Sequence, residues 1–119
     1  MKYMALIYTN AAMEPQYGTP EAGTVMAAYK AATETYIRDG IMRGGEALHP
    51  PAMATTVRVR GGKTETMDGP FAETKEQLGG YYIFECADID AAIKYAAMIP
   101  GAAHGSVELR PIMDFGSAA

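Results

Sequence analysis

Asp68 is the residue best suited to acid–base chemistry in this sequence. It opens the turn Asp68-Gly69-Pro70, in which a side-chain hydrogen bond, a glycine able to take positive φ and a proline would hold the carboxylate rigidly. A rigid carboxylate can act as a general acid or base, and Glu73 supplies a second one shortly after it. The alternative for Asp68 is a structural role in its own turn, and for Glu73 a position on the solvated surface.

Three other residues are candidates for binding a ligand: His49, Tyr81 and Glu85. The imidazole of His49, at the end of an apolar stretch, can carry a proton near neutral pH or hydrogen-bond a ligand; the alternative is a loop histidine without a chemical role. Tyr81 and Glu85 are four residues apart in a strand-like run, so they share one strand face. An aromatic ring beside a carboxylate on such a face is typical of a pocket or a dimer surface.

The residues that most often hold metals or phosphates are not spaced for either role. His49, His104 and Cys86 form no metal-ligand pattern, so we expect no metal and no cofactor. The glycine pairs 44–45 and 79–80 lack the Lys-Ser/Thr of a phosphate-binding loop, and for 44–45 we predict a bulge or a close backbone approach. Cys86, at the end of an apolar run, is better explained as a small buried hydrophobe than as a nucleophile.

Length and composition bound the class of protein. With 119 residues the chain predicts a single domain, 1–119, large enough to fold without metal or disulfide. The net charge of −4 and the scattered placement of the ten Lys and Arg residues argue against direct nucleic-acid binding. One cysteine allows no internal disulfide, and the apolar run at 3–8 is too short for a signal peptide or a membrane span. We therefore expect a cytoplasmic protein that does not associate with membranes.

Two segments have the start signals and the apolar spacing of helices. The first runs from Pro20 to Asp39, with Thr19 as its cap and proline at the first helical position. Its predicted apolar stripe is Ala22, Val25, Met26, Tyr29, Thr33, Tyr36 and Ile37. The second follows the cap Asp88 and stops at Pro100. Its predicted stripe is Ile89, Ala92, Ile93, Ala96 and Ile99.

Four segments are predicted as the main strands: 3–9, 41–49, 81–86 and 106–113. In the third we expect Tyr82, Phe84 and Cys86 to face the helices and Tyr81, Ile83 and Glu85 to face the other way, although alternation alone fits the reverse assignment equally well. In the fourth, the predicted inner face is Val107, Leu109 and Met113, and Pro111 favours an edge position. A loop is expected at 101–105.

A hairpin is predicted between the second and third main strands. Residues 55–60 and 63–67 alternate on both sides of Gly61-Gly62, and this register would pair Arg58 with Glu65 as an exposed ion pair. After it, 71–78 predicts a helical turn anchored by Phe71 and Leu78 and ended by Gly79-Gly80. The resulting order β-α-β-hairpin-β-α-β predicts an α+β fold of the split βαβ kind.

The run from Asp68 to Glu76, followed by Gly79-Gly80-Tyr81-Tyr82, resembles the signature of the DGPF-type branch of the YCII-related proteins. Three further blocks match in the same order, at 2–8, 44–51 and 105–113. The resemblance implies a ferredoxin-like α+β fold that pairs into a dimeric α/β barrel, bacterial origin, and no settled biochemical function.

The resemblance also bears on chemistry and regulation. The YCII-related proteins are thought to use a His and an Asp, with the His on the first helix, whereas the first predicted helix here contains no His. Asp68 would fill the Asp role, and its partner would be Tyr29, Lys30, Glu34 or His49. Members of the DGPF branch are commonly encoded beside extracytoplasmic-function sigma factors, which implies an indirect link to a sigma-factor response.

We favour the hypothesis of a homodimer that binds a small organic ligand between sheet and loop, with Asp68, Tyr81 and Glu85 near it. The alternative is an enzyme without a cofactor, in which Asp68 works with Glu73 or His49 as acid and base. A third hypothesis is a protein-interaction module without a ligand.

Overall fold

Four strands form one antiparallel sheet in the computed structural model, which describes residues 1–116. Their order across the sheet is β2-β5-β1-β6, so the two strands at the centre come from opposite halves of the chain. The strands are β1 (Lys2–Thr9), β2 (Met42–Ala47), β5 (Gln77–Glu85) and β6 (Ser106–Pro111). Every neighbouring pair is antiparallel, which is the arrangement of two interleaved βαβ units. The predicted α+β class is confirmed.

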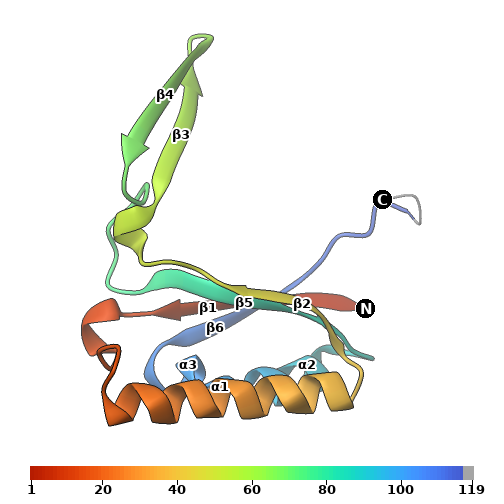
Figure 1. The fold of residues 1–119 in the computed structure, drawn as a ribbon. Coiled ribbons are helices and arrows are strands. Elements are labelled where there is room, and N and C mark those ends of the chain that lie inside the picture. The colour runs from red at the N-terminus through yellow and green to blue at the C-terminus, as the bar shows by residue number, and fades with distance from the viewer. Residues whose placement is uncertain (117–119) are drawn as a thin grey trace.

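The helices lie on one face of this sheet (Figure 1). They are α1 (Pro20–Arg38), α2 (Ile89–Ala96) and the short α3 (Gly101–His104), and single 3-10 turns occur at η1 (Ala11–Met13) and η2 (Pro51–Met53). The predicted loop at 101–105 was wrong, because α3 occupies most of it. None of the helices in the described part of the chain is both long and apolar enough to span a membrane.

Both predicted helix caps are confirmed. The Thr19 hydroxyl accepts a hydrogen bond from the Ala22 amide at 3.2 Å, and Pro20 takes the first helical position. The Asp88 carboxylate accepts from the Ala91 amide at 2.9 Å. Each cap satisfies an amide that the first helical turn leaves without a partner, which fixes where the helix begins.

The predicted apolar stripes were too wide. On α1 the buried residues are Ala32 and Tyr36, whereas Met26 and Ile37 are exposed. Ala32, Tyr36 and the half-buried Tyr29 follow one narrow line of the helix, and the two exposed side chains lie at its margin. In the second predicted stripe the same holds for Ile89 and Ile93 on α2, which are exposed beside the buried Ala92 and Ala96, while Ile99, just after α2, is buried. Because small residues bring each helix close to the sheet along one narrow row of side chains, the side chains on either side of that row stay in solvent.

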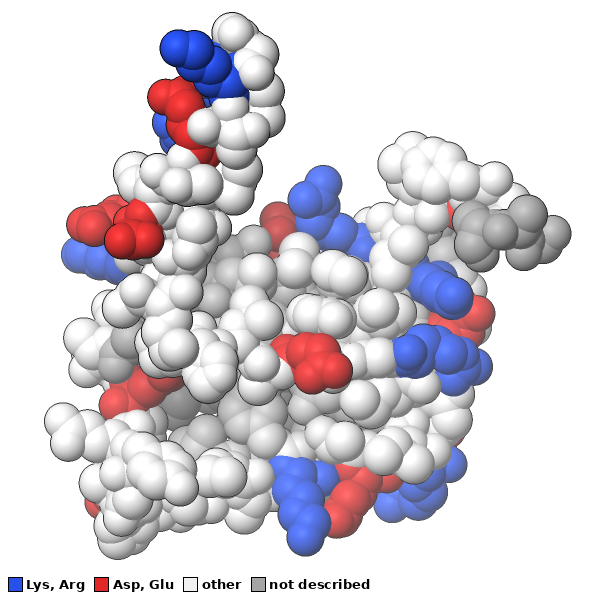
Figure 2. All heavy atoms as spheres, turned by 45° about the horizontal axis from the view of Figure 1, so that its top comes forward, with Lys and Arg blue, Asp and Glu red and all other residues white. Residues whose placement is uncertain are grey.

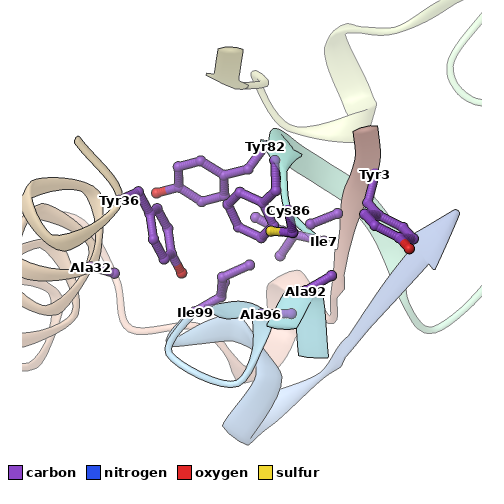
Figure 3. Packing of buried hydrophobic residues seen from close by; sticks show 11 residues of the cluster. Tyr3, Ile7, Ala32, Tyr36, Tyr82, Cys86, Ala92, Ala96 and Ile99 are labelled. Atoms are coloured by element: carbon purple, nitrogen blue, oxygen red, sulfur yellow. The ribbon is translucent and has the colours of Figure 1, made fainter. Parts of the chain in front are cut away.

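Tyr36 is the centre of the core (Figure 3). It is fully buried, and its ring packs edge-on against Phe84 and Tyr82, with ring centroids 4.8 and 5.2 Å away. Its hydroxyl donates to the Tyr95 carbonyl at 2.7 Å, which joins α1 to α2. Burial raises the pKa of the Tyr36 hydroxyl, so it stays protonated and keeps this hydrogen bond.

The predicted strand phase is confirmed. Tyr82, Phe84 and Cys86 are buried under the helices, and Tyr81, Ile83 and Glu85 lie half-buried on the opposite, open face. On that face β1 contributes Met4, Leu6 and Tyr8, also half-buried. The open face is largely uncharged at its centre, apart from an acidic spot (Figure 2).

The hairpin is confirmed and forms a separate two-stranded sheet of β3 (Thr55–Arg60) and β4 (Lys63–Asp68). Its register pairs Arg58 with Glu65, as predicted. The expected ion pair between them does not appear in the described structure, whose ion pairs are Met1–Glu85 and Arg38–Asp39. Both hairpin side chains are exposed, where an ion pair gains little over hydration.

The predicted helical turn at 71–78 was wrong. Strand β5 already begins at Gln77, so Gly79 and Gly80 lie inside a strand instead of ending a helix, and Phe71 is 75% exposed. The reason is backbone crowding: a Cβ on Gly80 would lie 2.8 Å from the Glu46 carbonyl oxygen.

The last strand was predicted too long. Strand β6 ends at Pro111, and Met113, assigned to its inner face, lies beyond it and is exposed. The edge position expected from Pro111 is confirmed, because β6 has β1 as its one neighbour in the described sheet.

Replacing Tyr36 tests whether it is the centre of the core. Tyr36→Phe should lower the free energy of unfolding by about 1 kcal/mol, because the Tyr95 carbonyl keeps its bond from the Met98 amide and one hydrogen bond is lost. Tyr36→Ala should lower it by about 3–5 kcal/mol. Urea unfolding would measure both, with Ile37→Ala as an exposed neighbour expected to change stability by less than about 0.5 kcal/mol. A Tyr36→Ala protein as stable as Ile37→Ala would contradict the assignment.

Candidate functional site

A cavity of about 420 Å³ lies between α1 and one end of the sheet. Its size is in the range of small-molecule sites, which are mostly about 300–1,000 Å³. Ile7 and Met42 contribute apolar side chains to its lining. Five of its lining residues carry a hydroxyl group: Thr9, Tyr29, Thr33, Tyr81 and Tyr82. Apolar wall with a few convergent polar groups is the usual composition of a ligand site.

Thr9 and Glu14 lie where this cavity meets two smaller hollows. Both residues line the cavity, a hollow of about 290 Å³ that includes His104, and a hollow of about 140 Å³ that includes His49. The Thr9 hydroxyl donates a hydrogen bond to the Glu14 carboxylate, which ties the loop after β1 to the strand. We call the cavity with its two hollows the Thr9–Glu14 site.

Tyr29 projects from the middle of α1 into this site. Burial raises the pKa of its hydroxyl, the backbone amide of Gly101 acts in the opposite direction by hydrogen bonding to it, and the nearby charge of Glu14 raises it further. The net effect is a raised pKa, so the group stays a neutral phenol. Tyr29 is therefore equipped to hydrogen-bond a ligand and poorly equipped to act as a base.

Tyr82 and Thr33 form a rigid wall of the cavity. Their hydroxyl oxygens lie 2.9 Å apart, in hydrogen-bond contact. The Tyr82 ring is buried and stacks on Phe84, with centroids 5.8 Å apart. One hydroxyl proton of this pair is engaged in their mutual bond, which leaves the other free to donate.

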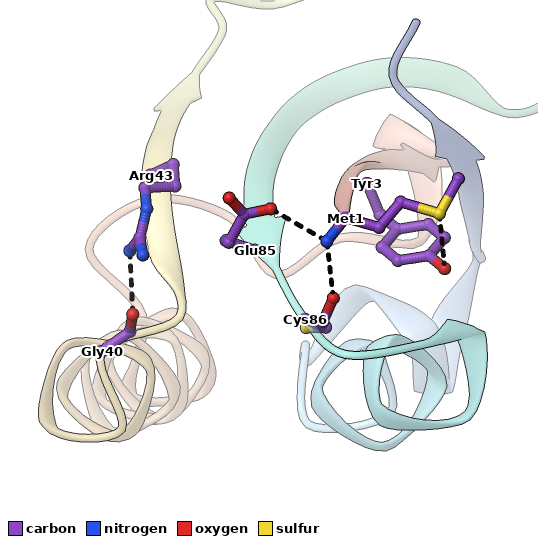
Figure 4. A network of polar contacts seen from close by, with 6 residues as sticks. All are labelled: Met1, Tyr3, Gly40, Arg43, Glu85 and Cys86. Atoms are coloured by element: carbon purple, nitrogen blue, oxygen red, sulfur yellow. Dashed lines mark hydrogen bonds and ion pairs between the residues drawn. The ribbon is translucent and has the colours of Figure 1, made fainter. Parts of the chain in front are cut away.

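The glycine pair at 44–45 behaves as predicted. The pairing of β2 with β5 shifts register between Met42 and Gly44, which is a bulge. The Arg43 guanidinium turns back and donates to the Gly40 carbonyl at 2.8 Å (Figure 4). At Gly45 the backbones approach so closely that a Cβ would lie 2.9 Å from the Tyr82 ring.

Two of the five predicted site residues lie at the Thr9–Glu14 site. Tyr81 lines the cavity and His49 the smaller hollow beside it. Glu85 lies elsewhere: its carboxylate is 3.2 Å from the amino group of Met1, an exposed ion pair at the far end of β5 (Figure 4).

Asp68 and Glu73 line neither the cavity nor its two hollows, and both are exposed. Asp68 ends β4, and Gly69 after it has the positive φ, +94°, that the predicted turn requires. The Gly69 amide donates to the Ala54 carbonyl at 2.7 Å, which closes the base of the hairpin. The acid–base roles of these two carboxylates stay predictions.

The possible metal ligands and the single thiol lie as follows in the described part of the chain. Among residues 1–116 no group of three or more His, Cys, Asp and Glu side chains is arranged to hold a metal. Cys86 is buried, as predicted, and burial raises the pKa of its thiol, which keeps it protonated and unreactive.

Comparison with known proteins identifies the family. The profile of the YCII-related domain matches residues 1–116. The chain belongs to the YCII-related family. An uncharacterized protein of Rhizobium meliloti (strain 1021) is 37% identical over 114 residues, which cover 94% of this chain and 92% of that protein.

Sequence reasoning did not single out Thr9, Glu14, Thr33 or Tyr82 as site residues of this YCII-related protein. Thr33 and Tyr29 were assigned to the apolar stripe of α1, although a pair of hydroxyl-bearing residues four apart on one helix face was an available signal. Glu14 lies in an aperiodic loop that offers no pattern. As a residue with a chemical role, Tyr29 was named in the sequence analysis as one of four possible partners of Asp68 in place of the absent first-helix His.

Gly45 and Gly44 form a matched pair for testing the cavity wall of the YCII-related fold. Gly45→Ala should lower the free energy of unfolding by about 1–3 kcal/mol, because its Cβ would lie 2.9 Å from the Tyr82 ring and 3.0 Å from the Tyr81 carbonyl oxygen. Gly44→Ala should change it by less than about 0.5 kcal/mol, since its Cβ would meet the movable end of Ile83 at 3.4 Å. Thermal unfolding of both variants measures the difference. Equal stability would mean that the two backbones are not held this closely.

Proposed function

We propose that this protein binds a small organic ligand in the Thr9–Glu14 site. The observation that carries the proposal is the convergence of four hydroxyl-bearing residues on one cavity of about 420 Å³: Thr9 from β1, Tyr29 and Thr33 from α1, and Tyr82 from β5. Such residues would normally be hydrated, and a concave site can offer their hydrogen bonds to a ligand together with apolar wall. The family relationship itself adds no activity, because the matched relative is uncharacterized.

The lining favours some ligands over others. Among the described residues, neither Lys nor Arg lines the cavity or its two hollows, while Glu14 contributes a carboxylate to all three. Phosphorylated or polycarboxylate ligands would meet no positive charge there and would be repelled by Glu14. The site suits a small neutral or cationic compound with hydrogen-bonding groups and an apolar body.

Filling the cavity tests this proposal. Ala47 lines the cavity from β2, so Ala47→Trp should abolish binding of compounds that occupy it; Ala27→Trp, on the exposed side of α1, makes the same change in size away from the lining. Ligand-observed NMR with a library of small fragments would be run on the wild type and both variants. We expect hits whose signal is lost in Ala47→Trp and kept in Ala27→Trp. Binding that is indifferent to Ala47→Trp, or no hits in the wild type, would contradict the proposal.

We also propose that two copies pair through the open face of the sheet, as in the dimeric α/β barrel that the DGPF-type signature implies. The centre of that face is mostly apolar around one acidic spot, and its margins are charged, which is the pattern of a protein interface. The central residues are Met4, Leu6, Tyr8, Tyr81 and Ile83, and the marginal ones include Lys2, Glu85, Glu108 and Arg110. The link to a sigma-factor response and the use of Asp68 in catalysis stay predictions.

Surface area supports the pairing. The single chain exposes 8515 Å². A compact monomer of 12.7 kDa is expected to expose about 6,200 Å², so the chain exposes about 2,300 Å² more than its mass requires. A standard interface removes about 800 Å² from each partner, and the excess is ample for one.

A charge on the open face should separate the copies. Ile83→Asp places a carboxylate among the apolar central residues, and we expect light scattering after size exclusion to give twice 12.7 kDa for the wild type and the single mass for the variant. Ile37→Asp is the control, because Ile37 is an exposed apolar residue on the helix side. A wild-type protein that is monomeric at micromolar concentration would refute the pairing.

A further inference from the structure

We infer that the β3–β4 hairpin is an arm that lies along a second copy of this chain. The inference rests on the pairing proposed above and adds to it a contact outside the sheet. The second copy would cover one surface, the uncharged face of the hairpin.

The hairpin has two chemically different faces. Strand pairing places Thr55, Val57, Val59, Thr64 and Thr66 on one of them, with Asp68 opposite Thr55 at the base. Apart from this Asp68, the side chains are uncharged and β-branched, and Val57 and Val59 are each 60% exposed. The opposite face carries Arg58, Arg60, Lys63 and Glu65. A face that stayed in solvent would have no need of this segregation, so the uncharged face is suited to being covered.

The hairpin has little support of its own. It is a separate sheet of two strands, and a two-stranded hairpin is at best marginally stable in water without further strands or a packing surface. Its base is fixed, because the Thr56 hydroxyl donates to the Gly69 carbonyl at 2.9 Å and the Gly69 amide to the Ala54 carbonyl at 2.7 Å. Beyond the base it projects away from the rest of the chain (Figure 1). A covering surface must therefore come from another molecule.

The direction of the hairpin identifies that molecule as a second copy. It rises on the side of the sheet opposite the helices, where we place the partner (Figure 1). Its charged side chains lie on its outer side, and the side toward the sheet is uncharged (Figure 2). The uncharged hairpin face and the apolar centre of the open face thus meet at an angle and border the same space above the sheet. A partner seated on the sheet would contact both.

The lengths agree with this arrangement. Packed sheets lie about 10 Å apart, whereas a strand of six residues spans about 20 Å, so the hairpin reaches past the level of a partner's sheet. The single chain also has a radius of gyration of 16.3 Å, against about 13.5 Å for a compact domain of its length. Its extents are 47 × 45 × 19 Å, so the projecting hairpin lengthens one of the two long dimensions and leaves the short one unchanged.

The test compares the two hairpin faces. The double variant Val57→Ser and Val59→Ser should weaken dimerization by about tenfold or more, because it removes apolar groups from the contact. The control, Arg58→Ser and Arg60→Ser, alters the outer face and should change the dissociation constant by less than about threefold. Sedimentation equilibrium measures both constants. Amide hydrogen exchange gives a second readout that needs no substitution on the hairpin. Exchange at residues 55–68 should be slow in the wild-type dimer and fast in the Ile83→Asp variant, which is expected to be monomeric.

The outcomes separate the two proposals. A wild-type dimer whose dissociation constant is unchanged by the two valine substitutions, or whose hairpin exchanges equally fast in the wild type and in Ile83→Asp, would overturn the arm and leave the sheet pairing intact. A monomeric wild type would overturn both.

Discussion

The packing of Tyr36 is the interaction on which the rest of the structure depends. This side chain of α1 contacts rings from β5 and α2 and donates its hydroxyl proton to the Tyr95 carbonyl. The Tyr95 hydroxyl in turn donates to the Asp39 carboxylate at 2.8 Å, and this bond, with Arg38, lowers the pKa of Asp39. The C-terminal end of α1 is thereby fixed against both the sheet and α2. Because helices are stiff, fixing that end also sets the positions of Tyr29 and Thr33 over the cavity.

Helices on one face of a sheet impose a second constraint, since the other face is left to solvent or to a partner. Here the helix face buries a small core of eleven described residues, which include Tyr36, Phe84 and Ile99. The open face holds apolar residues that are only half-buried, and the hairpin stands beside it. The cavity is lined by residues of a single chain, most of them on the helix side of the sheet. The proposed ligand site and the proposed pairing face therefore lie mainly on opposite sides of β5 and meet at Tyr81, which lines the cavity and belongs to the open face.

Local signals in the sequence predicted much of the fold. Caps at Thr19 and Asp88, the register of the hairpin and the phase of β5 follow from hydrogen bonds or alternation over a few residues, which tertiary contacts do not override. The errors came where tertiary contacts decide. Gly79 and Gly80 look like a helix stop, yet Gly80 is needed because a Cβ there would lie 2.8 Å from the Glu46 carbonyl oxygen. The width of a helix stripe likewise depends on how closely the helix approaches the sheet. Of the residues that line the cavity and its hollows, the sequence singled out His49 and Tyr81 as ligand-binding candidates, because the other lining residues come from segments that only the folded chain brings together.

Two glycines, Gly45 and Gly80, connect the cavity to the hairpin. Gly45 and Gly80 allow β2 and β5 to lie close together at the cavity wall, with a Cβ at either position meeting a neighbouring backbone oxygen at 3.0 Å or less. Beyond this crowded segment the two strands lead, through 48–54 and 69–76, into the base of the hairpin. A side chain in place of either glycine would force the strands apart at the cavity and alter the direction in which the hairpin leaves the sheet. Close backbone packing at one place thus sets both the shape of the cavity and the direction of the hairpin.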